Sequence, residues 1–104
     1  METGQRVLVV DDETSIRRYL RAALTAQGLA VYEAADGQEA LNAVLAHRPD
    51  LIILDLGLPD IDGIEVTRRL REWSQTPIII LSVREAEQDK IAALDAGADD
   101  YLTK

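Results

Sequence analysis

Acidic side chains follow two aliphatic runs in this chain, at the point where each run ends. Residues 7–10 lead into Asp11 and Asp12, and residues 51–54 lead into Asp55. Short continuous aliphatic runs are typical of strands that are buried on both faces of a parallel sheet. Carboxylates at the ends of such strands can bind a hard cation or act as nucleophiles. The two runs therefore predict one chemical site built from separate segments.

A cluster of these carboxylates would need a cation. Asp11, Asp12 and Asp55 converge if their two strands are neighbours, and close carboxylates raise one another's pKa and resist joint ionisation. Oxygen ligands without a nearby His or Cys favour Mg²⁺ over zinc or copper. The turn after Asp55 can add the backbone carbonyl of Gly57. The sequence therefore predicts a Mg²⁺ site made by these four residues.

Asp55 also has the chemistry of a phosphoryl acceptor. A carboxylate can attack phosphorus and carry an acyl phosphate, and the transfer needs positive charge and hydrogen-bond donors around the phosphoryl oxygens. The Lys104 ammonium and the Ser82 hydroxyl could supply these, because both follow later apolar runs. The sequence has neither a G-x-G-x-x-G after the first run nor a G-x-x-x-x-G-K-[ST]. This weighs against dinucleotide binding and nucleotide hydrolysis.

The composition limits the classes of protein to which this chain can belong. It has 104 residues, no cysteine and a net charge of −8. The length fits one small domain, the lack of cysteine suits the cytosol, and the negative charge argues against direct binding to a nucleic-acid backbone. We find no signal peptide and no apolar run near the roughly 20 residues of a spanning helix. We therefore expect a cytoplasmic protein with no membrane partner.

Five short apolar runs alternate with segments of helical periodicity. The runs, which we expect to be strands, are residues 6–10, 30–34, 51–54, 78–81 and 100–102. Strands that alternate with helices predict an α/β fold, here a doubly wound, five-stranded parallel sheet with right-handed crossovers. Ligands of such sheets bind beyond the carboxyl ends of the strands. Both groups of acids are expected at that edge.

Cap residues predict where several helices begin and end. Asp36 with Glu39 indicates a capping box. Asp62 can cap a helix that continues to Trp73, and Gly97 is a stop signal for the last helix.

Four motifs, taken together, resemble the receiver domain of two-component response regulators. They are VVDDE, DLIILDLGLPDIDG, IIILS and DAGADDYLTK, and the resemblance runs from Arg6 to Lys104. The last motif and LPDIDGIEV are most similar to the OmpR/PhoB class, whose members carry a C-terminal winged-helix DNA-binding domain. The resemblance implies the flavodoxin-like, or CheY-like, strand order 2-1-3-4-5.

The resemblance also implies roles for the candidate residues. Asp55 would accept a phosphoryl group from the phosphohistidine of a sensor histidine kinase. Mg²⁺ would be held directly by Asp12 and through water by Asp11. Ser82 would follow the phosphoryl group, Tyr101 would move inward with it, and Lys104 would pair with a phosphoryl oxygen. The class responds by homodimerisation through helix four, strand five and helix five, and reaches promoter DNA through its effector domain.

In this family the chain continues past the lysine that corresponds to Lys104 with a proline and a fifth helix. We therefore expect residues 1–104 to be a receiver domain truncated before the last helix, with the DNA-binding domain absent. Apolar residues near strand five would then lack a cover. We expect self-association or lower stability than that of a full receiver.

Other classes of protein share part of this pattern. An aspartate-nucleophile phosphatase uses the same Asp and Mg²⁺ chemistry, but such enzymes usually have a second acid two residues after the nucleophile, where this chain has Gly57. A plain Mg²⁺- or Ca²⁺-binding interaction domain and a stand-alone receiver remain alternatives. Taken singly, Ser82, Tyr101 and Lys104 could be ordinary strand-end, packing and terminal residues.

Overall fold

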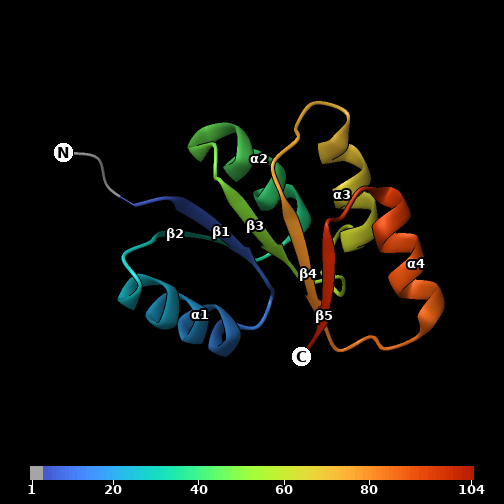
Figure 1. Cartoon of the computed structure of the whole chain (residues 1–104), viewed down its shortest axis with the longest axis horizontal. Helices are drawn as coiled ribbons and strands as arrows, with labels where there is room; N and C mark the ends of the chain where they lie inside the picture. Colours follow the sequence, from blue (N-terminus) through green and yellow to red (C-terminus); the bar gives the residue numbers. More distant parts are fainter. Residues whose placement is uncertain (1–3) are drawn as a thin grey trace.

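The structure is a computed structural model that describes residues 4–104. Five strands and four helices alternate along this part of the chain (Figure 1). Their bounds are β1 Arg6–Val10, α1 Thr14–Ala26, β2 Ala30–Ala34, α2 Gly37–His47, β3 Leu51–Leu54, α3 Gly63–Arg71, β4 Ile78–Ser82, α4 Glu87–Ala96 and β5 Asp100–Thr103. The predicted α/β fold is confirmed.

All five strands form one parallel sheet in the order β2-β1-β3-β4-β5, as predicted. The direction in which the chain adds strands reverses at β1, because β2 lies on one side of β1 and β3 on the other. Val10 is in register with Leu54 and with Ala34. The ends of β1 and β3 therefore lie side by side, and the acids that follow them begin at the same level.

Helices α2, α3 and α4 lie on one face of the sheet, and α1 covers the other face at β1 and β2, so β1 is buried on both sides and is a continuous aliphatic run. Alternate residues of β1 enter different clusters: Leu8 and Val10 pack on the side of α2, α3 and α4, whereas Val7 and Val9 pack on the side of α1. Figure 1 shows α1 on one side of the sheet and the other three helices on the opposite side. β1 is thus fixed rigidly between two apolar layers.

Helix α1 is less buried than its apolar spacing suggests. None of its residues is fully buried, and Tyr19 is 70% exposed. The helix packs mainly on β1 and β2 and is the only helix on its side of the sheet within residues 4–104 (Figure 1). The expected self-association is untested and stays a prediction. No helix in this described part is long and apolar enough to cross a bilayer.

The predicted helix caps are confirmed. The Asp36 carboxylate accepts a hydrogen bond from the Glu39 N–H at 2.8 Å, and the Glu39 carboxylate accepts one from the Ala35 N–H. The Asp62 carboxylate accepts one from the Ile64 N–H at 2.9 Å.

The far end of α3 differs from the expectation, because the helix ends at Arg71 rather than at Trp73. The Trp73 N–H bonds to the carbonyl of Leu70, three residues earlier, which tightens the last turn. The Arg71 guanidinium also holds the carbonyls of Ser74 and Thr76. Trp73 is therefore turned outward and is 47% exposed.

Candidate functional site

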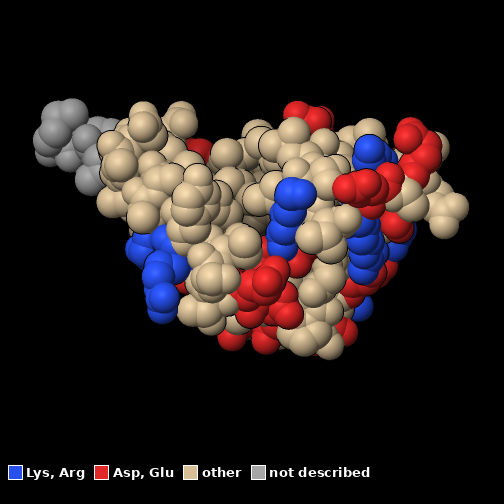
Figure 2. Space-filling view, turned by 90° about the horizontal axis from the view of Figure 1, so that it is seen from below, with Lys and Arg blue, Asp and Glu red and all other residues tan. Residues whose placement is uncertain are grey.

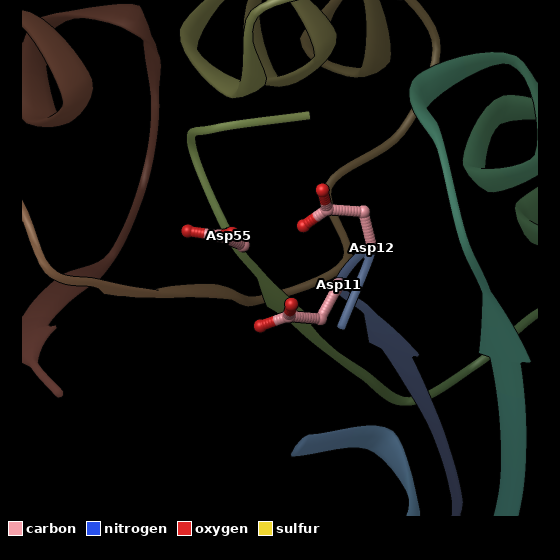
Figure 3. Close-up of side chains that lie close together, drawn as sticks. All are labelled: Asp11, Asp12 and Asp55. Atoms are coloured by element: carbon pink, nitrogen blue, oxygen red, sulfur yellow. The ribbon is translucent and has the colours of Figure 1, made fainter. Parts of the chain in front are cut away.

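Three carboxylates meet at the carboxyl edge of the sheet. Ligand oxygens of Asp11, Asp12 and Asp55 all lie within 4.8 Å of one another. Figure 3 shows Asp11 and Asp12 leaving the end of β1 and Asp55 leaving the end of β3. Asp11 and Asp55 are only 2% and 6% exposed, whereas Asp12 is exposed to solvent. The predicted convergence of acids from two segments is confirmed.

The sheet ladder itself positions these acids. The Asp11 N–H donates to the Ala34 carbonyl at 3.1 Å, and the Asp55 N–H donates to the Val10 carbonyl at 2.9 Å. Each bond continues the parallel ladder by one step beyond the strand, so the backbone of both acids is as well fixed as the strands. The buried carboxylates thus have little freedom to separate.

Gly63 allows α3 to begin directly against the Asp55 backbone. A Cβ at Gly63 would lie 2.5 Å from the Asp55 carbonyl oxygen and 2.7 Å from the Leu56 Cα. The Gly63 N–H donates to the Leu56 carbonyl at 2.9 Å. Any larger residue would push the helix away from the segment that carries Asp55.

Lys104 lies among the carboxylates. Its ammonium is 2.8 Å from Asp11 Oδ2 and 3.4 Å from both Asp55 Oδ2 and Glu13 Oε1. Partial burial lowers the pKa of Lys104, but the hydrogen bond to Asp11 and the charges of Asp55 and Asp11 outweigh it, so the pKa is raised. The Lys104 N–H donates to the Ser82 carbonyl at 2.9 Å, which fixes its backbone beside β4. The ammonium is therefore held in place as a cation.

Ser82 is the last residue of β4, and Tyr101 belongs to the adjacent strand β5. Ser82 is 1% exposed, and its hydroxyl oxygen accepts a hydrogen bond from the Arg84 N–H at 3.2 Å. The Tyr101 hydroxyl donates to the Arg84 carbonyl at 2.8 Å, and partial burial raises the pKa of Tyr101. Both residues thus contact the loop between β4 and α4.

These side chains surround a cleft of about 260 Å³ at the edge of the sheet. Its lining is Asp12, Glu13, Asp55, Gly57, Ser82, Val83, Arg84 and Lys104. Figure 2 looks onto the face at which the strands end and shows acidic side chains gathered near its middle. A cleft beside Trp73 is larger, at about 430 Å³, but no acidic side chain lines it. The chemistry therefore belongs to the smaller cleft.

The donor set fits a divalent cation with a preference for oxygen. Four carboxylates lie at this edge, those of Asp11, Asp12, Glu13 and Asp55, and the Lys104 ammonium pairs with three of them. Carboxylate oxygens at this spacing suit Mg²⁺, and the loop with Gly57 lines the same cleft. The site thus has both the charge and the ligand type that Mg²⁺ requires.

Three charged residues at this edge are not among the predicted site residues. Glu13 and Arg84 line the cleft, and Arg17 donates from Nη1 to the Asp11 carbonyl at 2.6 Å. The position of Glu13 directly after the two acids and the position of Arg84 in a loop at this edge were available signals. Nothing in the helical position of Arg17 indicates its contact, because a long side chain can reach many partners.

Comparison with known proteins connects this geometry to a family. The response regulator receiver domain family matches residues 7–104. The KDP operon transcriptional regulatory protein KdpE of Escherichia coli K12 is 61% identical over 98 residues, which cover 94% of this chain and 44% of that protein. KdpE of Mycobacterium tuberculosis H37Rv is 55% identical over 94% of this chain and 43% of its own length. This chain thus spans less than half the length of these relatives.

Solved structures agree with the sequence relatives. The receiver domain of the Francisella response regulator 1452 has a TM-score of 0.91 at 37% identity, over 97% of this chain and 84% of that one. The chemotaxis response regulator CheY4 of Vibrio cholerae also has a TM-score of 0.91 at 37% identity, over 98% of this chain and 88% of that one.

The predicted resemblance to the OmpR/PhoB class is confirmed by these relatives. The stretches DLIILDLGLPD, LREWS and DKIAALDAGADDYL further predict a near relative of the potassium-responsive regulator KdpE, in agreement with the identities above. Together with the strand order and the acidic cleft, they show that this chain belongs to the response regulator receiver domain family.

Proposed function

We propose that this chain is the phosphoacceptor switch of a KdpE-type response regulator and that Asp55 accepts the phosphoryl group from a sensor histidine kinase. The observation that carries the proposal is the meeting of Asp11, Asp12 and Asp55 around one cleft with Lys104 beside them. Asp55 is nearly buried, and of the three aspartates it is the one that both pairs with the ammonium and lines the cleft. The chain would react once per activation and would not act as a turnover enzyme.

In the proposed transfer, an Asp55 carboxylate oxygen attacks the phosphorus of a phosphohistidine. The new O–P bond forms as the P–N bond breaks, and the electron pair of the broken bond returns to the imidazole, which takes up a proton. The Lys104 ammonium, 3.4 Å from Asp55 Oδ2, can pair with a phosphoryl oxygen. The Ser82 hydroxyl can donate a hydrogen bond to another. These groups neutralise charge where it accumulates.

The acids at this edge would hold the metal. Asp12 and Asp55 would bind the ion directly and Asp11 through water, and the carbonyl of Gly57 would be a further ligand. When bound, Mg²⁺ supplies positive charge against the phosphoryl oxygens. Asp11 keeps its bond with Lys104, which orients the ammonium toward Asp55.

The proposed output is homodimerisation on activation. Ile91 and Leu94 on α4 are 52% and 46% exposed, and they give this side of the domain an apolar surface. A change that begins at Ser82 would reach it through Tyr101, which belongs to β5. By likeness to the KdpE relatives, we propose a cytoplasmic transcription regulator that contacts promoter DNA through a winged-helix effector domain.

The test is incubation with acetyl phosphate and Mg²⁺, followed by intact-mass measurement. We expect a gain of one phosphoryl group in the native chain and no gain in Asp55→Asn. Asp95→Asn is the control and should gain the same group, because Asp95 is an exposed carboxylate of α4 that does not line the cleft. An unmodified native chain would overturn the proposal. Phosphate release over many turnovers would indicate a phosphatase instead.

A further inference from the structure

Arg84 contacts both proposed switch residues through its backbone. Its N–H donates to the Ser82 hydroxyl oxygen at 3.2 Å, and its carbonyl accepts from the Tyr101 hydroxyl at 2.8 Å. Arg84 is also one of the residues that line the cleft, together with Asp55 and Lys104. One loop residue thus connects the cleft with the two residues that are expected to respond to phosphorylation.

The Arg84 guanidinium is held by carboxylates outside the cluster. Its Nη2 donates to Asp62 Oδ2 at 2.9 Å, and its Nη1 lies 3.9 Å from Asp89 Oδ1. The side chains of Arg84 and Asp62 are 33% and 46% exposed. Ion pairs with this much solvent contact are weak and exchange readily. Arg84 is therefore attached to the start of α3 by a contact that a stronger anion can replace.

The cleft offers such an anion once Asp55 carries a phosphoryl group. Lys104 is already shared among Asp11, Asp55 and Glu13, so it cannot neutralise a phosphoryl dianion alone. A guanidinium binds two phosphoryl oxygens at once, and such bonds are stronger than a bond to one exposed carboxylate oxygen. Of the residues that line this cleft, Arg84 and Lys104 are the two that carry positive charge.

We propose that Arg84 is a phosphoryl-sensing residue that exchanges partners. Building on the function proposed for Asp55, the guanidinium leaves Asp62 Oδ2 and binds the phosphoryl oxygens. Its backbone then shifts the hydrogen bonds to Ser82 and Tyr101. Asp62 acts as a competitor that holds Arg84 away from the cleft in the unphosphorylated chain. It remains the cap of α3 throughout, because its Oδ1 accepts from the Ile64 N–H.

The experiment measures binding of beryllofluoride, a phosphoryl mimic, by calorimetry in the presence of Mg²⁺. Arg84→Met removes the charge and keeps the backbone contacts, and we expect binding weaker by about tenfold. Arg84→Lys should recover part of the loss. Asp62→Asn keeps the cap oxygen and removes the competing charge, so we expect binding severalfold tighter. This gain must vanish in the double variant, and Arg18→Met serves as an exposed arginine control.

The outcomes separate this inference from the proposed function. A native chain that binds no beryllofluoride and gains no phosphoryl group contradicts the function of Asp55. If the native chain binds and Arg84→Met binds equally well, only the role of Arg84 is refuted. Exchange is also refuted if Asp62→Asn binds no tighter, or if its gain persists without Arg84. Circular dichroism of each variant identifies a loss of binding that comes from misfolding, and in that case the Arg84→Lys and Asp62→Asn results decide.

Discussion

Replacing Gly63 by alanine should destabilise the domain, because Gly63 packs against the backbone of Asp55, the proposed phosphoryl acceptor. The added Cβ would lie 2.5 Å from the Asp55 carbonyl oxygen and 2.7 Å from the Leu56 Cα. Both are backbone atoms of a segment tied to β1, so neither can rotate away. Gly57 gives a matched control in the loop that leads to α3, because a Cβ there would lie 4.0 Å from its nearest neighbour, Asp55 Oδ2.

The expected magnitude follows from two opposing effects. Overpacking against fixed atoms costs about 3 kcal/mol, the upper part of the usual range. Alanine in place of glycine returns about 1 kcal/mol through helix propensity and a less flexible unfolded chain. Gly63→Ala should therefore lose about 2 kcal/mol of unfolding free energy, or about 10 °C in Tm for a domain of this size. Gly57→Ala, whose φ is not positive, should change stability by less than about 1 kcal/mol.

Urea unfolding followed by circular dichroism measures both variants against the native chain. The same Gly63→Ala protein should be phosphorylated more slowly by acetyl phosphate, because relief of the contact displaces the backbone at Asp55. Equal unfolding free energies for the two alanine variants would refute the reasoning. They would mean that α3 can move off the Asp55 segment at no cost.

Two further variants test the electrostatics of the fold. Lys104→Met removes the ammonium that competes with Mg²⁺ for Asp11 and Asp55. Because charges a few ångströms apart in water interact by about 1 kcal/mol or more, calorimetry should give a Mg²⁺ affinity about tenfold higher. An unchanged affinity would show that the ammonium does not compete. The bond from Arg21, above all, lowers the pKa of the Glu33 carboxyl. This stabilisation is complete above the ordinary Glu pKa near 4.3 and is lost as pH falls through the lower folded value. Glu33→Gln should cost at most about 1 kcal/mol at pH 7 and nothing at pH 2 by urea unfolding, and an equal cost at both pH values would contradict the assignment.

The strands and the acidic edge could be predicted because each rests on a local signal. β1 and β3 are continuous aliphatic runs that only a sheet covered on both faces can bury. Once those strands are parallel neighbours, Asp11 and Asp55 must follow at the same level. The caps at Asp36 and Asp62 are equally local, since each carboxylate bonds an N–H two or three residues later. Such features depend on a few adjacent residues and on the regular geometry of helices and strands.

The long basic side chains could not be placed in the same way. Arg71 bonds to the Gly97 carbonyl and pairs with Asp99, residues 26 and 28 positions later. Arg17, in the first turn of α1, donates to the Asp11 carbonyl. No periodicity encodes these contacts, because flexible side chains find partners only after the elements have packed. The sequence therefore indicated the acids of the site and Lys104, but not the arginines around them.

The structure divides the proposed switch into fixed and movable parts. Asp11, Asp55 and Lys104 each donate a backbone N–H that continues the sheet ladder, so the acceptor and its counter-charge are held by the most rigid element of the fold. Arg84 lies in the loop after β4, and its guanidinium is held by the carboxylates of Asp62 and Asp89, which are 46% and 30% exposed. A new dianion at Asp55 would therefore act against a fixed background, and the loop would yield first. Movement of this loop would change the hydrogen bonds of Arg84 to Ser82 and Tyr101. One added charge at Asp55 would in this way alter the outer surface of β5.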